Sequence, residues 1–126
     1  MSKIFLAGLL AAGAAGALVA PVAAQGAALG PSAALCNSNA TAVLVDVREA
    51  DEFASGHIAG AISMPLSRFQ PSRLPADGRQ VILACAAGRR AMMALEKAAA
   101  ARDDVDTHLA SGMTAWRAAG LPVVTE

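Results

Sequence analysis

The chain has few aromatic side chains and no excess of charge of either sign. Tyrosine is absent, Trp116 is the one tryptophan, and phenylalanine occurs three times in 126 residues. Stacking of successive nucleobases needs several aromatic side chains, and phosphate binding needs an excess of basic ones. Lysine and arginine together number 10, as do aspartate and glutamate, so the formal net charge is zero. These absences argue against a nucleic-acid partner and against a polybasic membrane patch.

Cysteine and histidine are equally scarce, with two of each in the chain. No group of Cys36, Cys85, His57, His108 and the carboxylates has the spacing of a metal site, so we expect neither a metal nor another cofactor. The sequence leaves a Cys36–Cys85 disulfide open, because pairing depends on distances in the fold. Cys36 lies in a polar, loosely patterned stretch and is interpreted as a spare thiol. Both histidines are expected to be structural.

The first residues have the three-part pattern of a secretory signal peptide. A short basic start at residues 1–3 precedes an uncharged apolar run at 4–20, and the small residues at 21–24 form a cleavage pattern. We predict cleavage after Ala24 and a periplasmic or secreted protein. An uncleaved membrane anchor is the alternative, because the run nearly reaches the roughly 20 residues that span a bilayer. Cleavage would leave 102 residues, enough for one small domain.

Strand and helix patterns alternate along the rest of the chain. Residues 25–41 are interpreted as a linker with one short helical turn near 32–35, and residues 42–126 as the folded domain. Strands are predicted at 42–47, 61–64, 81–84 and 107–109, helices at 49–54, 90–101 and 113–119, and an irregular loop at 66–78. The strands are too apolar to be half-exposed. The pattern therefore predicts an α/β fold with a parallel-rich central sheet and helices on both faces.

The run Cys-Ala-Ala-Gly-Arg-Arg at residues 85–90 lies between the predicted strand 81–84 and the predicted helix 90–101. In open α/β sheets, ligands bind beyond the carboxyl ends of the strands. Backbone N–H groups that converge there on a helix N-terminus bind anions and favour a thiolate over a thiol. The sequence therefore predicts that Cys85 is a nucleophile.

The other residues of this run are predicted to bind the substrate. Arg90 is the first choice for holding an anionic group because it closes the loop at the helix start, and Arg89 is the second. Gly88 is expected to provide a backbone conformation that other residues disfavour. Ala86 and Ala87 add no charge and leave the donor undetermined.

Three ordered segments resemble the signatures of the rhodanese family of sulfurtransferases. They are residues 44–49 with Phe53 and 56–61, the run 85–90, and residues 112–123. The resemblance covers residues 43–124. Two departures stand out. Ser111 occupies a position where the family commonly has glycine, and the segment before Val43 is short and polar, where family members usually carry a helix that packs on the sheet.

The resemblance implies a three-layer rhodanese-like fold and covalent sulfur transfer. In that chemistry the Cys85 thiolate would attack the outer sulfur of thiosulfate or a similar small anionic donor and form a persulfide. Cyanide or a thiol acceptor would then take the sulfur. Asp46 and Arg48 are expected to support the site by pairing or capping near it.

Three other functions fit parts of the pattern. A non-catalytic or partner-dependent sulfur carrier would form the persulfide but turn over poorly alone, so a redox or sulfur-relay protein is a candidate partner. Thiol redox chemistry would need a resolving cysteine, and Cys36 has no recognisable placement for that role. The related cell-cycle dual-specificity phosphatases have five residues between cysteine and arginine, whereas four separate Cys85 from Arg90. We therefore expect no useful phosphatase activity.

Overall fold

The structure is a computed structural model that describes residues 27–37 and 41–125. The predicted signal peptide and its cleavage site after Ala24 lie outside the described residues. One sheet has the strand order β1-β5-β4-β2-β3, and each strand pairing is parallel. The strands are β1 (Ala27–Leu29), β2 (Ala42–Asp46), β3 (Ile62–Ser63), β4 (Gln80–Ala84) and β5 (Thr107–Leu109). The predicted parallel α/β fold is confirmed.

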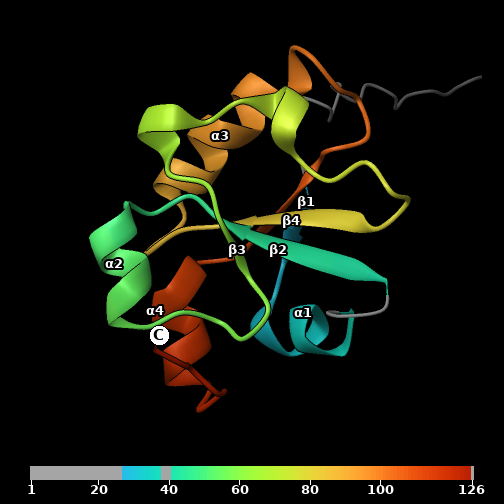
Figure 1. Cartoon of the computed structure of the whole chain (residues 1–126). Helices are drawn as coiled ribbons and strands as arrows, with labels where there is room; N and C mark the ends of the chain where they lie inside the picture. Colours follow the sequence, from blue (N-terminus) through green and yellow to red (C-terminus); the bar gives the residue numbers. More distant parts are fainter. Residues whose placement is uncertain (1–26, 38–40, 126) are drawn as a thin grey trace, which may run out of the picture.

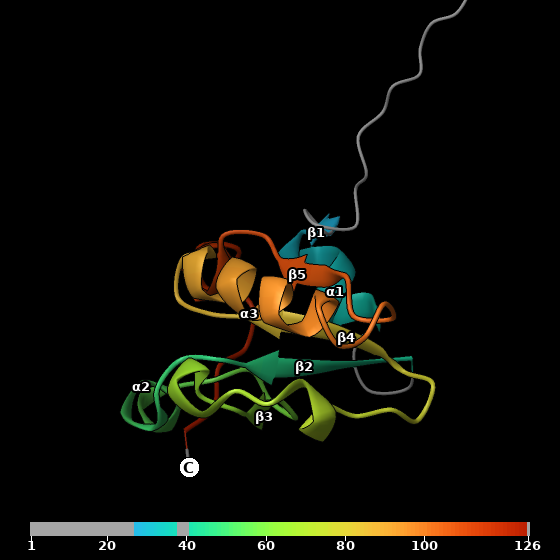
Figure 2. The same cartoon turned by 90° about the horizontal axis from the view of Figure 1, so that it is seen from above.

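Helices cover both faces of this sheet, as Figures 1 and 2 show. They are α1 (Pro31–Asn37), α2 (Ala50–Ser55), α3 (Arg89–Ala99) and α4 (Gly112–Ala118), with 3-10 turns η1 (Leu66–Arg68) and η2 (Pro71–Arg73). In Figure 1, α3 and the two 3-10 turns lie above the sheet, whereas α1 and α4 lie below it. Within the described part of the chain, no helix is long and apolar enough to cross a membrane.

Two hydrophobic clusters fill the space between the layers. Successive residues of a strand point to opposite faces, so β4 contributes Leu83 to one cluster and Ile82 to the other. Leu83 packs on the α3 side with Leu95 of that helix. Ile82 packs on the α4 side with Trp116, which is 1% exposed. Both faces of β4 are therefore buried, and this explains its uninterrupted apolar sequence.

The N-terminal part of the described chain differs from the sequence interpretation. Residues 25–41 were expected to be a linker with one helical turn, but β1 and α1 form there. β1 adds to the sheet through β5, where Ala27 pairs with Thr107 and Leu29 with Leu109. Ala34 of α1 is fully buried in the α4-side cluster. The helix that family members usually carry before Val43 is therefore present as α1, which is longer than the predicted turn at 32–35 and packs against the sheet.

His108 on β5 is a half-buried titratable group with an unusual environment. Its Nδ1 atom is buried and has no hydrogen-bond partner among the described residues. Burial lowers the pKa of His108, because a charged imidazole would lose its hydration there. In the strand register His108 lies opposite Leu83 of β4, in keeping with the expectation of a structural histidine on an apolar strand.

The depressed pKa of His108 predicts that stability falls as the solution is acidified. In the unfolded chain the imidazole takes up a proton below about pH 6.5, while the folded protein leaves it neutral. The stability linked to the neutral His108 imidazole is fully present above that pH. It is lost as the pH falls toward the lowered pKa of His108 in the folded protein. Urea unfolding at about pH 7.5 and about pH 5.5 should show a loss that His108→Leu reduces. An unchanged pH slope in the variant would assign the effect to other groups.

Candidate active site

Cys85 follows directly on the last residue of β4 and begins what we call the Cys85 loop, residues 85–90. Its side chain is 1% exposed. The backbone N–H of Gly88 donates a hydrogen bond of 2.9 Å to the sulfur atom. An N–H directed at sulfur stabilises negative charge there, and the thiolate is the nucleophilic form of cysteine. The loop thus curls around the Cys85 sulfur and directs a donor at it.

The carbonyl groups of Cys85 and Ala86 are bound by the start of α4. The Cys85 carbonyl accepts a 2.8 Å hydrogen bond from the Met113 N–H. The Ala86 carbonyl accepts bonds from the Thr114 N–H, at 2.9 Å, and from the Thr114 hydroxyl, at 3.0 Å. In a planar trans peptide, C=O and N–H point in opposite directions. The N–H groups of Ala86 and Ala87 therefore point away from α4.

Gly112 allows this close approach between α4 and the loop. A Cβ atom at Gly112 would lie 2.1 Å from the Cys85 carbonyl oxygen, far inside any real contact distance. Gly112 also has a φ of 54°, a conformation that disfavours L side chains. Ser111, which stands in place of a glycine, has a φ of 56° and is likewise left-handed. The turn thus keeps its left-handed geometry in spite of the serine.

Gly88 has the conformational role that the sequence predicted. Its φ is 114°, and it is the N-cap residue of α3. That conformation is open mainly to glycine, and it lets the Gly88 N–H face the Cys85 sulfur while its carbonyl accepts from Met92.

Arg90 lies at the loop but forms an ion pair with Glu52 of α2. The Nη1 and Nη2 atoms of Arg90 donate hydrogen bonds of 2.6 and 2.9 Å to the two carboxylate oxygens of Glu52. This pairing lowers the pKa of Glu52 to about 2, with the Arg90 hydrogen bond as the largest cause. Arg89 is exposed, and its role in substrate binding stays a prediction.

Asp46 and Arg48 form a second, buried ion pair at the end of β2. The closest contact, between Arg48 Nη2 and Asp46 Oδ2, is 2.7 Å, and both side chains are less than a tenth exposed. Arg48 also donates to the Gly56 carbonyl at 2.7 Å, which fixes the turn after α2. Pairing near the site is what the sequence predicted for these two residues. His57 stacks on Phe53 and its Nδ1 lies 2.9 Å from the Phe53 carbonyl oxygen, in keeping with a structural role.

Glu52 and Thr114 were missed by the sequence interpretation. Glu52 accepts the backbone N–H of Glu49 at 3.1 Å, a capping-box contact that the E-x-x-E spacing indicates. That signal predicts a helix start and gives no indication of the partner at Arg90. Thr114 carries no sequence signal that distinguishes it from any helical threonine. The side chain of Cys36 lies outside what the structure describes, so its interpretation as a spare thiol stays a prediction.

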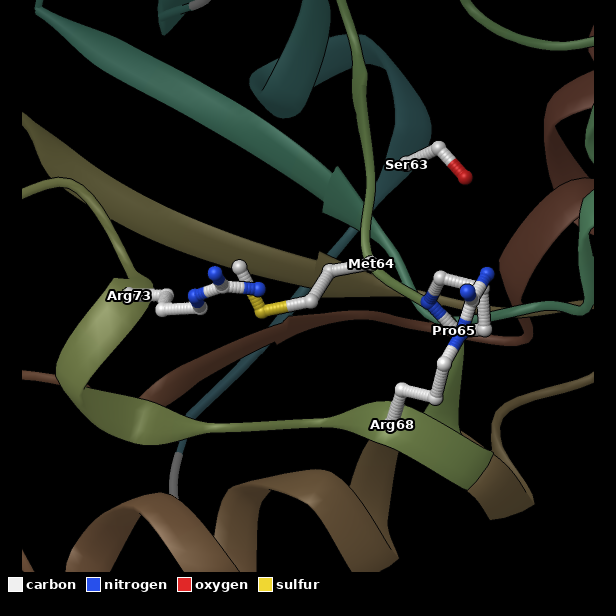
Figure 3. Close-up of a pocket in the computed structure, with 5 residues that line it drawn as sticks. All are labelled: Ser63, Met64, Pro65, Arg68 and Arg73. Carbon is white, nitrogen blue, oxygen red and sulfur yellow. The ribbon is translucent and has the colours of Figure 1, made fainter.

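A hollow of about 270 Å³ lies outside the Cys85 loop (Figure 3). It is lined by Ser63, Met64, Pro65, Arg68 and Arg73. Ser63 pairs with Asp46 and Asp46 with Ala84, so the hollow begins at the same edge of the sheet as the Cys85 loop, two strands away. None of the predicted site residues lines it. The described residues also contain no cluster of three histidine, cysteine or acidic side chains that would suit a metal.

The fold and the Cys85 loop agree with the comparisons to known proteins. The chain belongs to the rhodanese-like domain family, whose model matches residues 32–119. An uncharacterized protein of Synechocystis sp. is 46% identical over 83 residues, which cover 65% of this chain and 46% of that protein. An HTH-type transcriptional regulator of Mycobacterium tuberculosis is 40% identical over 83 residues, covering 64% of this chain and 36% of that protein. The chain thus spans less than half the length of these curated relatives.

Solved structures with the same fold include single-domain and longer proteins. A rhodanese-related protein of Thermoplasma volcanium has a TM-score of 0.71 at 25% identity, covering 79% of this chain and 99% of that one. A thiosulfate sulfurtransferase of Pseudomonas aeruginosa has a TM-score of 0.69 at 25% identity, covering 80% of this chain and 20% of that one. The chain therefore carries a module of the sulfurtransferase or sulfur-carrier type.

Replacing Gly112 by alanine should destabilise the protein far more than the same change at Gly120. Both glycines have positive φ values, 54° and 74°, so both variants carry the cost of a left-handed alanine, about 1–2 kcal/mol. A Cβ at Gly120 meets nothing within 4 Å, whereas one at Gly112 collides with the Cys85 carbonyl. Denaturant unfolding should show a further loss of about 1–3 kcal/mol for Gly112→Ala. Equal losses would mean that Gly112 is required only for its φ.

Proposed function

We propose that the protein is a sulfurtransferase that carries sulfane sulfur as a persulfide on Cys85. The donor would be thiosulfate or a similar small anion, and the acceptor would be cyanide or a thiol. The observation that carries the proposal is the Gly88 N–H directed at the Cys85 sulfur, in a loop whose first two carbonyls, of Cys85 and Ala86, are bound by α4. The similarity to a thiosulfate sulfurtransferase and the family membership support it.

The geometry suits both halves of such a reaction. In the first half, the Cys85 thiolate attacks the outer sulfur of thiosulfate, the S–S bond breaks, and sulfite leaves with the bonding pair. Cys85 gains the outer sulfur and becomes the persulfide, and the step as a whole needs no external oxidant. The N–H groups of Ala86, Ala87 and Gly88 are suited to stabilise the negative charge that collects on the outer sulfur. In the second half, cyanide or a thiolate attacks that sulfur and frees the Cys85 thiolate.

A partner-dependent sulfur carrier is the second candidate, and the burial of Cys85 supports it. At 1% exposure, the side chain offers little surface to an acceptor in solution. Similar segments in longer proteins, one of them a transcriptional regulator, are consistent with a module that serves attached or associated partners. A redox or sulfur-relay protein is the kind of partner that this alternative implies.

Mass spectrometry of the purified protein after thiosulfate treatment tests the proposal. We expect an increment of one sulfur on the wild type and on Cys36→Ser, and none on Cys85→Ser. Cyanide should remove the added sulfur as thiocyanate. An adduct that cyanide leaves in place would favour the carrier, and loss of turnover in Cys36→Ser would contradict a mechanism with a single cysteine.

We also propose that residues 1–24 are removed on export to the periplasm or to the medium. The fold supports a cut after Ala24, because β1 begins at Ala27. The Ala27 N–H donates a hydrogen bond to the carbonyl of Asp106, the residue before β5. Cleavage there would leave the whole sheet intact. N-terminal sequencing of the protein from a fractionated native host should give Gln25 as the first residue. Intact residues 1–24 in a membrane fraction would indicate the anchor instead.

A further inference from the structure

Two arginines line the hollow outside the Cys85 loop, and neither forms an ion pair among the described residues. Arg68 belongs to η1 and Arg73 to η2, and both side chains are exposed. None of the residues that line the hollow is acidic. A guanidinium group without a carboxylate partner can bind an anion without first breaking an ion pair within the protein. The hollow is therefore suited to receive negative charge.

The acidic side chains closest to the hollow in the fold are bonded to other groups. Asp46, at the end of the neighbouring β2, is bound to Arg48. Glu49 accepts a 2.7 Å hydrogen bond from the hydroxyl of Ser67 in η1. Glu49 does not line the hollow. The positive charge of the hollow is thus not cancelled by a carboxylate among its own lining residues.

Met64 is the apolar side chain of the hollow, and the two arginines lie on either side of it. In Figure 3, Arg68 and Arg73 reach from their 3-10 turns toward the segment that carries Met64 and Pro65. The Met64 side chain extends toward Arg73, and Arg68 lies on the other side of it, beside Pro65. Methionine is flexible and adapts to an apolar group placed on it. A ligand that matches this arrangement carries two anionic groups with an apolar group between them.

The hollow is open and lies near the predicted nucleophile. Met64 is half-buried and packs against the α3-side cluster, which also contains Cys85. A volume of about 270 Å³ is below the usual range of small-molecule pockets, about 300–1,000 Å³. With exposed arginines at its sides, the hollow suits side chains that a larger molecule presents. The zero net charge and the few aromatic side chains of the chain argue against nucleic acid as that molecule.

We infer that the hollow is the docking site for an acidic segment of a partner protein, in which two carboxylates flank an apolar residue. One carboxylate pairs with Arg68 and the other with Arg73, while the apolar residue covers Met64. Because the hollow begins at the edge of the sheet that also carries the Cys85 loop, the docked partner lies beside that loop. Docking goes beyond the proposed sulfur transfer and requires no step of it.

NMR titration of the isotope-labelled protein with three short blocked peptides tests the inference. The probe has the core Glu-Leu-Glu, and the controls have Gln-Leu-Gln and Glu-Ser-Glu. We expect the probe to shift the backbone amides of residues 63–73. The dissociation constant should rise roughly tenfold for Gln-Leu-Gln, which lacks both charges, and roughly threefold for Glu-Ser-Glu, which lacks the apolar contact. Added salt should weaken the probe, because exposed charges are screened.

Arg68→Gln and Arg73→Gln should each weaken binding of the probe roughly threefold to fivefold, since each removes one partly exposed ion pair. Arg117→Gln is the matched control. Arg117 is likewise exposed and without an ion pair among the described residues, but it lies on α4, at the opposite face of the sheet (Figure 1). This variant should bind the probe as the wild type does.

The inference fails if the probe does not bind, if the shifted amides lie outside residues 63–73, or if Arg117→Gln weakens binding as much as Arg73→Gln does. Equal binding of inorganic phosphate or of a short single-stranded oligonucleotide would also overturn it, because the hollow would then be a general anion site. The peptide comparison uses the unaltered protein and decides even where a variant does not fold. Cys85→Ser should bind the probe normally, so failure of docking and failure of sulfur transfer are separate results.

Discussion

The contact between the start of α4 and the carbonyls of Cys85 and Ala86 is the constraint on which the site depends. The carbonyl oxygens of the first two peptide units of the loop accept hydrogen bonds from α4, so the N–H groups of these units must point away from α4. A loop that was free to rotate these units would lose its set of convergent donors. The helix that makes this contact is itself fixed by Trp116, which is buried and donates to the Pro122 carbonyl at 2.8 Å. Packing on one face of the sheet is thereby transmitted to the orientation of the loop amides.

The same loop is fixed from the other side by electrostatic contacts. Arg90 joins the first turn of α3 to α2 through Glu52, and Arg48 joins the end of β2 to Gly56. In a partly exposed pair such as Arg90 with Glu52, the gain in stability is small. The geometric consequence is larger, since two planar groups with two hydrogen bonds allow little freedom. The Arg90–Glu52 pair thus holds the start of α3 against α2.

The sequence predicted the sheet and the loop well because their signals are local. β2 and β4 are buried on both faces, so each appears as an unbroken apolar run, and the Cys85 run follows β4 directly. β1 was missed because it has three small or partly exposed residues and gains its structure from pairing with β5, far along the chain. The position of Arg90 was predictable, but its partner was not, because 38 residues separate it from Glu52. Contacts of this kind come from the fold and leave no periodic pattern in the sequence.

Because Cys85 is buried and the nearby Arg48 and Arg90 are both paired, much of the recognition falls to the backbone. Side chains that select a donor by charge would have to reach the sulfur, yet Ala86 and Ala87 are too short and Arg90 is already bonded. Backbone N–H groups recognise any sulfur centre that develops negative charge, whatever group is attached to it. A side chain that could add selectivity is Arg89, which is exposed and has no ion pair among the described residues.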